Sequence, residues 1–121
     1  MGLMIEAQMA DGVSIRVYRA DPKAPPRAGI VIMHEAFGMN DHIRDMCDRY
    51  AAEGYLTVSP ALYDRLEYGV EILGYSEADL ELALKLRKGA DWDQPVSDMR
   101  SAIKMVREAG SVGVVGYCWG G

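Results

Sequence analysis

The sequence of 121 residues is short of cysteine and has no excess of positive charge. Its two cysteines, Cys47 and Cys118, are too few for a disulfide framework and do not have the spacing of a metal-binding motif. Thirteen Lys and Arg residues stand against 18 Asp and Glu, so the net charge is -5 and no basic face is available to neutralise nucleic-acid phosphates. These shortages exclude a disulfide-stapled scaffold and argue against a nucleic-acid partner.

Long hydrophobic runs, internal repeats and low-complexity tracts are also missing. No segment approaches the roughly 20 apolar residues that cross a bilayer, and no basic region precedes a long apolar stretch near the start of the chain. We therefore expect no membrane partner, a reduced cytoplasmic setting, and no cofactor or metal. The length is enough for a single domain at most, so residues 1–121 form one domain or part of one.

Half of the residues are apolar, and their spacing predicts strands. Residues 14–18 alternate in polarity after the turn-forming pair Asp11-Gly12, which indicates an edge hairpin. Residues 28–33 and 112–117 are apolar runs of the kind that is buried in a parallel sheet.

A helical pattern follows the strand at residues 28–33. Asn40 or Asp41 can cap a helix that Gly54 ends, and residues 55–59 then form a short strand stopped by Pro60. Strand, helix and strand in this order are typical of a parallel βαβ unit. The predicted fold class is therefore α/β, with helices covering a mostly parallel sheet.

Residues 61–75 have no clean period and are interpreted as a loop that carries binding residues at the carboxyl end of a strand. Two more helices are predicted after it. One begins at a capping box formed by Ser76 and Asp79, and the other begins near Pro95 and ends at Gly110.

The most informative stretch is residues 116–121, which read GYCWGG. A nucleophile elbow, in which a strand turns sharply into a helix, has the pattern G-x-S-x-G, and here Cys118 stands in the central position. Gly116 and Gly120 are the small residues such a turn needs, because neighbouring chain passes too close for side chains there. A glycine-rich strand end with a small buried cysteine is the alternative. A dinucleotide fingerprint has a different glycine spacing.

Cys118 is the first candidate for catalysis, because a thiolate is strongly nucleophilic and forms covalent acyl intermediates. His34 and Glu35 follow the strand at residues 28–33, where open parallel sheets bind their ligands. Glu35 could serve as base or proton partner of the thiol, or be a carboxylate satisfied by loop amides. His34 could be a base or a structural residue.

Arg65 and Tyr63 are candidates for binding substrate. Arg65 could hold a carboxylate through a bidentate fork, or form a surface ion pair with Asp64 or Glu67. Tyr63 could donate a hydrogen bond near an oxyanion, or simply pack.

Four segments together resemble the amino-terminal half of the dienelactone hydrolases, a cysteine-dependent family of α/β-hydrolases. They occur in family order and are residues 30–38 (IVIMHEAFG), Ile43-Arg44 with residues 51–55 (AAEGY), residues 59–65 (SPALYDR) and residues 112–121 (VGVVGYCWGG). The resemblance runs from about Asp11 onwards and implies the amino-terminal part of an α/β-hydrolase fold, truncated at the nucleophile elbow. Members of the family hydrolyse the enol-lactone ring of dienelactones formed in the breakdown of aromatic compounds.

The resemblance also implies roles for single residues. Cys118 is similar to the nucleophile, and Glu35 to the glutamate that helps to generate its thiolate. Arg65 is similar to an arginine that holds the substrate carboxylate. The backbone amides of Ala36 and Trp119 would form the oxyanion hole. The implied substrate is a small lactone or carboxylic ester.

The triad aspartate and histidine of the family have no counterparts in these 121 residues, so we expect the isolated chain to be inactive or nearly so. In an α/β-hydrolase the strand before the nucleophile is central. Its far edge would be unpaired here and would invite a homodimer or a complementing chain. The alternatives are a subunit of a split hydrolase and a non-catalytic dimerising module. A flavodoxin-like nucleotide domain lacks the phosphate-cradling loop it would need.

Overall fold

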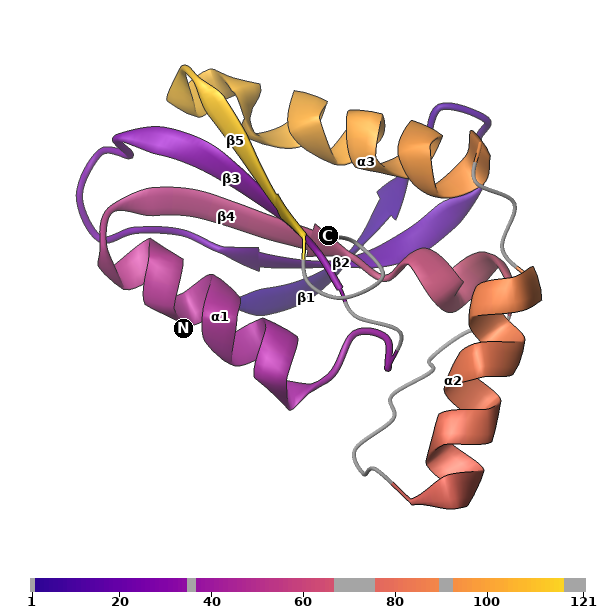
Figure 1. Cartoon of the computed structure of the whole chain (residues 1–121). Helices are drawn as coiled ribbons and strands as arrows, with labels where there is room; N and C mark the ends of the chain where they lie inside the picture. Colours follow the sequence, from indigo (N-terminus) through magenta and orange to yellow (C-terminus); the bar gives the residue numbers. More distant parts are fainter. Residues whose placement is uncertain (1, 35–36, 67–75, 90–92, 117–121) are drawn as a thin grey trace.

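The computed structural model describes residues 2–34, 37–66, 76–89 and 93–116. Five strands form one mixed sheet in the order β1-β2-β4-β3-β5, with helices on both of its faces (Figure 1). The strands are β1 (Leu3–Gln8), β2 (Ser14–Ala20), β3 (Ala28–Met33), β4 (Tyr55–Pro60) and β5 (Val112–Gly116). The helices are α1 (Asp41–Ala52), α2 (Glu77–Gly89) and α3 (Asp93–Val106), with short 3₁₀ helices η1 (Leu62–Arg65) and η2 (Arg107–Ala109).

The predicted edge hairpin is confirmed. β1 and β2 pair in antiparallel register, and Gly12 has a φ of 88° in the turn between them. A side chain at this φ would be strained, which explains the glycine. The Asp11 carboxylate accepts a hydrogen bond of 3.3 Å from the Val13 amide and so helps to close the turn.

The predicted βαβ unit is confirmed as β3, α1 and β4, because β3 and β4 are parallel neighbours. Asn40, one of the two predicted caps, accepts a hydrogen bond of 3.2 Å from the Ile43 amide. Gly54 has a φ of 101° and donates its amide to the Ala51 carbonyl, which ends the helix. The α/β fold class follows from this unit.

Two apolar layers hold the helices to the sheet. Successive strand residues point to opposite faces, so β3 contributes Val31 to one layer and Ile32 to the other. α3 packs on the first face and α1 on the second (Figure 1). The approach of α3 is close: a Cβ on Gly29 of β3 would lie 2.7 Å from the Val106 carbonyl oxygen. Glycine is needed at this position.

The later helices follow the sequence pattern closely. The Ser76 hydroxyl accepts a hydrogen bond of 3.2 Å from the Asp79 amide, and Asp79 accepts from Ser76 in return, so the capping box of α2 is confirmed. α3 begins at Asp93, which places Pro95 in its first turn. Residues 62–65 of the predicted loop form the single turn η1.

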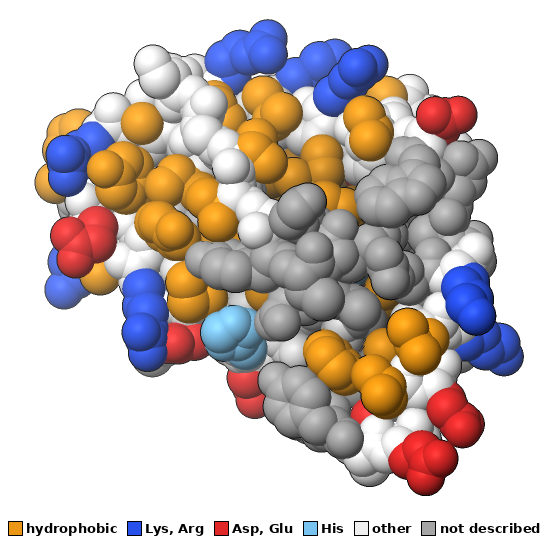
Figure 2. Space-filling view, in the orientation of Figure 1, with side chains coloured by type: hydrophobic (Ala, Val, Ile, Leu, Met, Phe, Trp, Pro, Cys, Tyr) orange, Lys and Arg blue, Asp and Glu red, His pale blue; other side chains and the backbone are white. Residues whose placement is uncertain are grey.

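β5 is more exposed than its apolar pattern indicates, which agrees with the expectation of an unpaired far edge. Among the described residues it pairs only with β3, and 55% of Val114 is accessible to solvent. Figure 2 shows hydrophobic side chains gathered on the side of the molecule where β5 lies. A strand with one neighbour cannot bury both of its edges, so an apolar, β-branched sequence does not guarantee burial here.

Candidate active site

The carboxyl ends of three parallel strands meet at one edge of the sheet. Val31 of β3 is in register with Val58 of β4, and Met33 of β3 is in register with Gly116 of β5. The chain segments that leave these three ends are the ones that sequence analysis selected as functional. Ligands of open α/β sheets bind at this edge.

Four of the predicted catalytic residues lie outside the described residues: Glu35, Ala36, Cys118 and Trp119. Glu35 is two residues along the sequence from Met33, and Cys118 is two residues from Gly116. The strands that precede them, β3 and β5, are parallel neighbours, and the last pair in their register is Met33 with Gly116. The roles of these four residues stay predictions.

His34 joins the end of β3 to η1. Its side chain is fully buried, and its Nε2 accepts a hydrogen bond of 3.0 Å from the Leu62 amide. An imidazole nitrogen that accepts a hydrogen bond carries no proton, so this ring is held as a neutral tautomer. The geometry agrees with the structural alternative for His34 rather than with a free general base.

Tyr63 lies in the core beneath this edge. Only 2% of it is exposed, and its ring centroid is 4.9 Å from that of His34 at an interplanar angle of 59°. The ring thus helps to position η1. A contact between its hydroxyl and substrate stays a prediction.

Arg65 is the last residue of η1, and the next residue, Leu66, donates its amide to the Tyr63 carbonyl. The neighbouring Asp64 is bound by Arg16 of β2, with Nη2 to Oδ1 at 3.0 Å and Nε to Oδ2 at 3.1 Å. Sequence analysis missed Arg16. It occupies a polar position in an alternating strand, which is typical of a solvated residue, and nothing in the local pattern indicates a partner 48 positions away.

The second cysteine has a different environment. Cys47 is fully buried on the inner side of α1, and burial first, then the charge of Asp48, raises the pKa of its thiol to about 12. It therefore remains a neutral thiol at ordinary pH and packs as a small apolar side chain. This separates Cys47 from the role predicted for Cys118.

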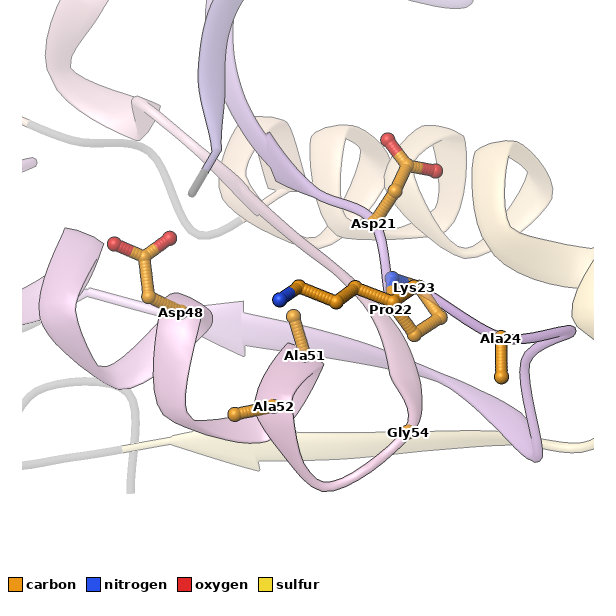
Figure 3. A pocket seen from close by; sticks show the side chains of 8 residues that line it. All are labelled: Asp21, Pro22, Lys23, Ala24, Asp48, Ala51, Ala52 and Gly54. Carbon is orange, nitrogen blue, oxygen red and sulfur yellow. The ribbon is translucent and has the colours of Figure 1, made fainter.

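A hollow of about 380 Å³ lies elsewhere, at the amino ends of β3 and β4 (Figure 3). Its polar lining residues are Asp21, Lys23 and Asp48, and the Lys23 side chain extends across it toward α1. Asp48 is already engaged, because Tyr18 donates a hydrogen bond of 2.9 Å to it. None of the predicted site residues lines this hollow.

Two further observations apply to the described residues alone. No group of three or more His, Cys, Asp or Glu side chains is arranged to hold a metal ion there. None of the helices in that part of the chain is long and apolar enough to span a membrane.

The whole chain can be compared with known proteins. A sequence model of the dienelactone hydrolase family matches residues 15–121. The chain belongs to this family. It is 35% identical over 121 residues to the carboxymethylenebutenolidase of Pseudomonas putida, a match that covers 97% of this chain and 51% of that protein.

Other members show the same extent of similarity. The corresponding enzyme of Pseudomonas knackmussii is also 35% identical over 121 residues, with 97% of this chain and 51% of that protein covered. A Klebsiella pneumoniae crystal structure assigned to the dienelactone hydrolases superposes with a TM-score of 0.79 at 28% identity, covering 99% of this chain and 51% of that one. The fold is thus the amino-terminal part of an α/β-hydrolase, and the chain spans about half the length of these relatives.

Proposed function

We propose that the protein containing these residues hydrolyses a lactone or carboxylic ester through a cysteine acyl-enzyme. One observation carries the proposal: the register of Met33 with Gly116 brings together the strand ends that precede Glu35 and Cys118. Membership of the dienelactone hydrolase family supports the same reaction class. Hydrolysis of a carboxylate-bearing lactone from the breakdown of aromatic compounds is the proposed role.

In this mechanism the Cys118 thiolate attacks the acyl carbonyl and the ring or ester oxygen leaves. Glu35 takes part in forming the thiolate, and the amides of Ala36 and Trp119 stabilise the oxyanion of the tetrahedral intermediate. Water then attacks the thioester and releases the acid. Arg65 binds the substrate carboxylate, and Tyr63 assists at the same end of the site.

The general base for the second step must come from outside residues 1–121. The sequence has two histidines, and neither is suited to the role. His34 is buried with Nε2 occupied by the Leu62 amide, and His42 is exposed on the first turn of α1. We therefore propose that the 121 residues alone turn over slowly or not at all.

The exposed edge of β5 favours a second candidate, in which a separate chain supplies the missing strand and base. Val114 is 55% exposed, and β5 has β3 as its single partner among the described residues. In this split hydrolase, activity appears only after two chains are mixed. A dimer of two copies would use the same edge but would supply no triad histidine.

The nucleophile is tested by replacing each cysteine in the natural protein. Cys118→Ala should lower kcat for phenyl acetate by about 1,000-fold or more, because no acyl-enzyme can form. Intact mass spectrometry of the quenched reaction should show the acyl adduct in the wild type and not in Cys118→Ala.

Cys47→Ala is the matched control and should keep both activity and adduct, since Cys47 is a buried neutral thiol. Full activity of Cys118→Ala, or an adduct on Cys47, would contradict the proposed mechanism.

A further inference from the structure

Arg16 and Asp64 form a buried ion pair that joins β2 to the turn carrying Arg65. The Asp64 side chain is 1% exposed and that of Arg16 is 15% exposed. The guanidinium donates through Nε to Oδ2 at 3.1 Å and through Nη2 to Oδ1 at 3.0 Å. The Arg16 backbone amide also donates to Oδ2, at 2.8 Å. The Asp64 carboxylate is thus bound by both the guanidinium and the backbone amide of Arg16.

The same residue of β2 holds η1 at a second point. The Arg16 carbonyl accepts a hydrogen bond of 2.9 Å from the Ala61 amide, directly before the turn. From the other side, the Leu62 amide donates to His34 at 3.0 Å. Both neighbouring strands therefore contribute to the placement of η1.

These contacts decide the position of η1 because the turn cannot do so itself. A 3₁₀ helix of four residues has few internal hydrogen bonds and little intrinsic stability. The Asp64 amide bonds to Ala61 and the Leu66 amide to Tyr63, both within the turn and its flanks. If the Arg16 side chain is changed, η1 loses the ion pair that ties its Asp64 carboxylate to β2, and the segment that ends at Arg65 is held less firmly.

The pair also matters for charge. Asp64 immediately precedes Arg65 in the sequence. A buried carboxylate without compensation would attract a neighbouring guanidinium and compete with an anionic substrate for it. Arg16 compensates this charge through the ion pair at 3.0 Å.

We infer that Arg16 and Asp64 are positioning residues that set recognition of the substrate carboxylate, by fixing the backbone from which Arg65 extends. The inference rests on the proposed hydrolysis and on the role proposed for Arg65. It goes further in locating part of the substrate specificity in an ion pair between β2 and η1.

The test compares two substrates that differ in one carboxylate. Monophenyl succinate carries a free carboxylate, and its methyl ester carries the same phenyl ester without the charge. For the natural protein, Asp64→Asn and Arg16→Lys should each raise KM for monophenyl succinate by about tenfold or more, with kcat changed by less than about threefold. Neither constant for the methyl ester should change by more than about threefold.

Arg19→Lys is the matched control. Arg19 lies on the same strand and forms its ion pairs with Asp21 at 3.0 Å and Glu108 at 3.2 Å, away from η1. This variant should leave both substrates unchanged. Asp64→Asn keeps the size of the side chain, so it serves as the second variant should Arg16→Lys not fold.

The outcomes separate the two proposals. Equal loss for both substrates, or no loss for either, would overturn the inference while ester hydrolysis stands. A wild type that does not prefer the free carboxylate would overturn the inference and the role of Arg65. A wild type that hydrolyses neither substrate would overturn the proposed function and this inference together.

Discussion

At the scale of single residues, the two cysteines show how environment separates chemically identical side chains. Cys47 is fully buried on α1, and Cys118 follows the last residue of β5 by two positions. The first therefore packs as an apolar group, whereas the second is proposed as the nucleophile. Residue type alone does not distinguish them, but helical spacing and the flanking glycines do.

The raised pKa of Cys47 predicts a dependence of stability on pH. The folded thiol titrates at about 12 and the unfolded one near 9.0, so its contribution to stability is complete below pH 9 and is lost as pH rises toward 12. The slope is at most about 1.4 kcal/mol per pH unit, because the unfolded state alone is ionised in that window.

The free energy of unfolding of the natural protein and of Cys47→Ala is measured with urea at a series of pH values from 8 upwards. The contribution of the thiol should appear as a difference between the two proteins in the slope of this free energy against pH. The variant loses packing at every pH, but its free energy of unfolding should fall less steeply above pH 9. Identical slopes for the two proteins would show that the thiol is not desolvated.

At the scale of elements, local capping explains where helices begin. The Asn40 side chain accepts from the Ile43 amide at 3.2 Å and is 8% exposed. Asn40→Ala should lower the free energy of unfolding by about 1 kcal/mol, because one amide at the start of α1 loses its partner. Chemical denaturation of the natural protein measures this directly.

The control for the cap is an exposed ion pair on the same helix. Arg49 Nε lies 2.9 Å from Asp45 Oδ2, and the side chains of Asp45 and Arg49 are 54% and 73% exposed. Asp45→Ala should therefore lower the free energy of unfolding by less than about 0.5 kcal/mol. A cost for Asn40→Ala no greater than that for Asp45→Ala would contradict the capping role.

At the scale of the whole molecule, β5 is one of the two edge strands of the sheet that the structure describes. Val114 is 55% exposed there, and an apolar strand edge is a template for pairing with another chain. The 121-residue chain should therefore self-associate at micromolar concentration. Val114→Lys should weaken this association by about tenfold or more, since a charge on an edge strand opposes pairing.

Sedimentation velocity compares the two proteins over a range of concentrations. Val13→Lys is the control, because Val13 is 42% exposed in the turn after β1 and lies at the other side of the sheet. Association that is equally weakened by both substitutions, or by neither, would show that β5 is not the surface involved.

Sequence analysis predicts much of the fold because its signals are local. The cap at Asn40, the box at Ser76 and the turn at Gly12 each depend on residues within a few positions, and all three are confirmed. The parallel pairing of β3 with β4 follows from the intervening helix. Family membership was accessible for the same reason, since the motifs are contiguous in sequence.

The sequence by itself determined the order of elements, their caps and the segments that carry the proposed chemistry. Only the tertiary structure decided that Arg16 meets Asp64 and that His34 accepts from Leu62. The physical reason is distance along the chain. Capping and turn energies depend on neighbours a few residues away, whereas an ion pair across 48 residues depends on which strands pack side by side.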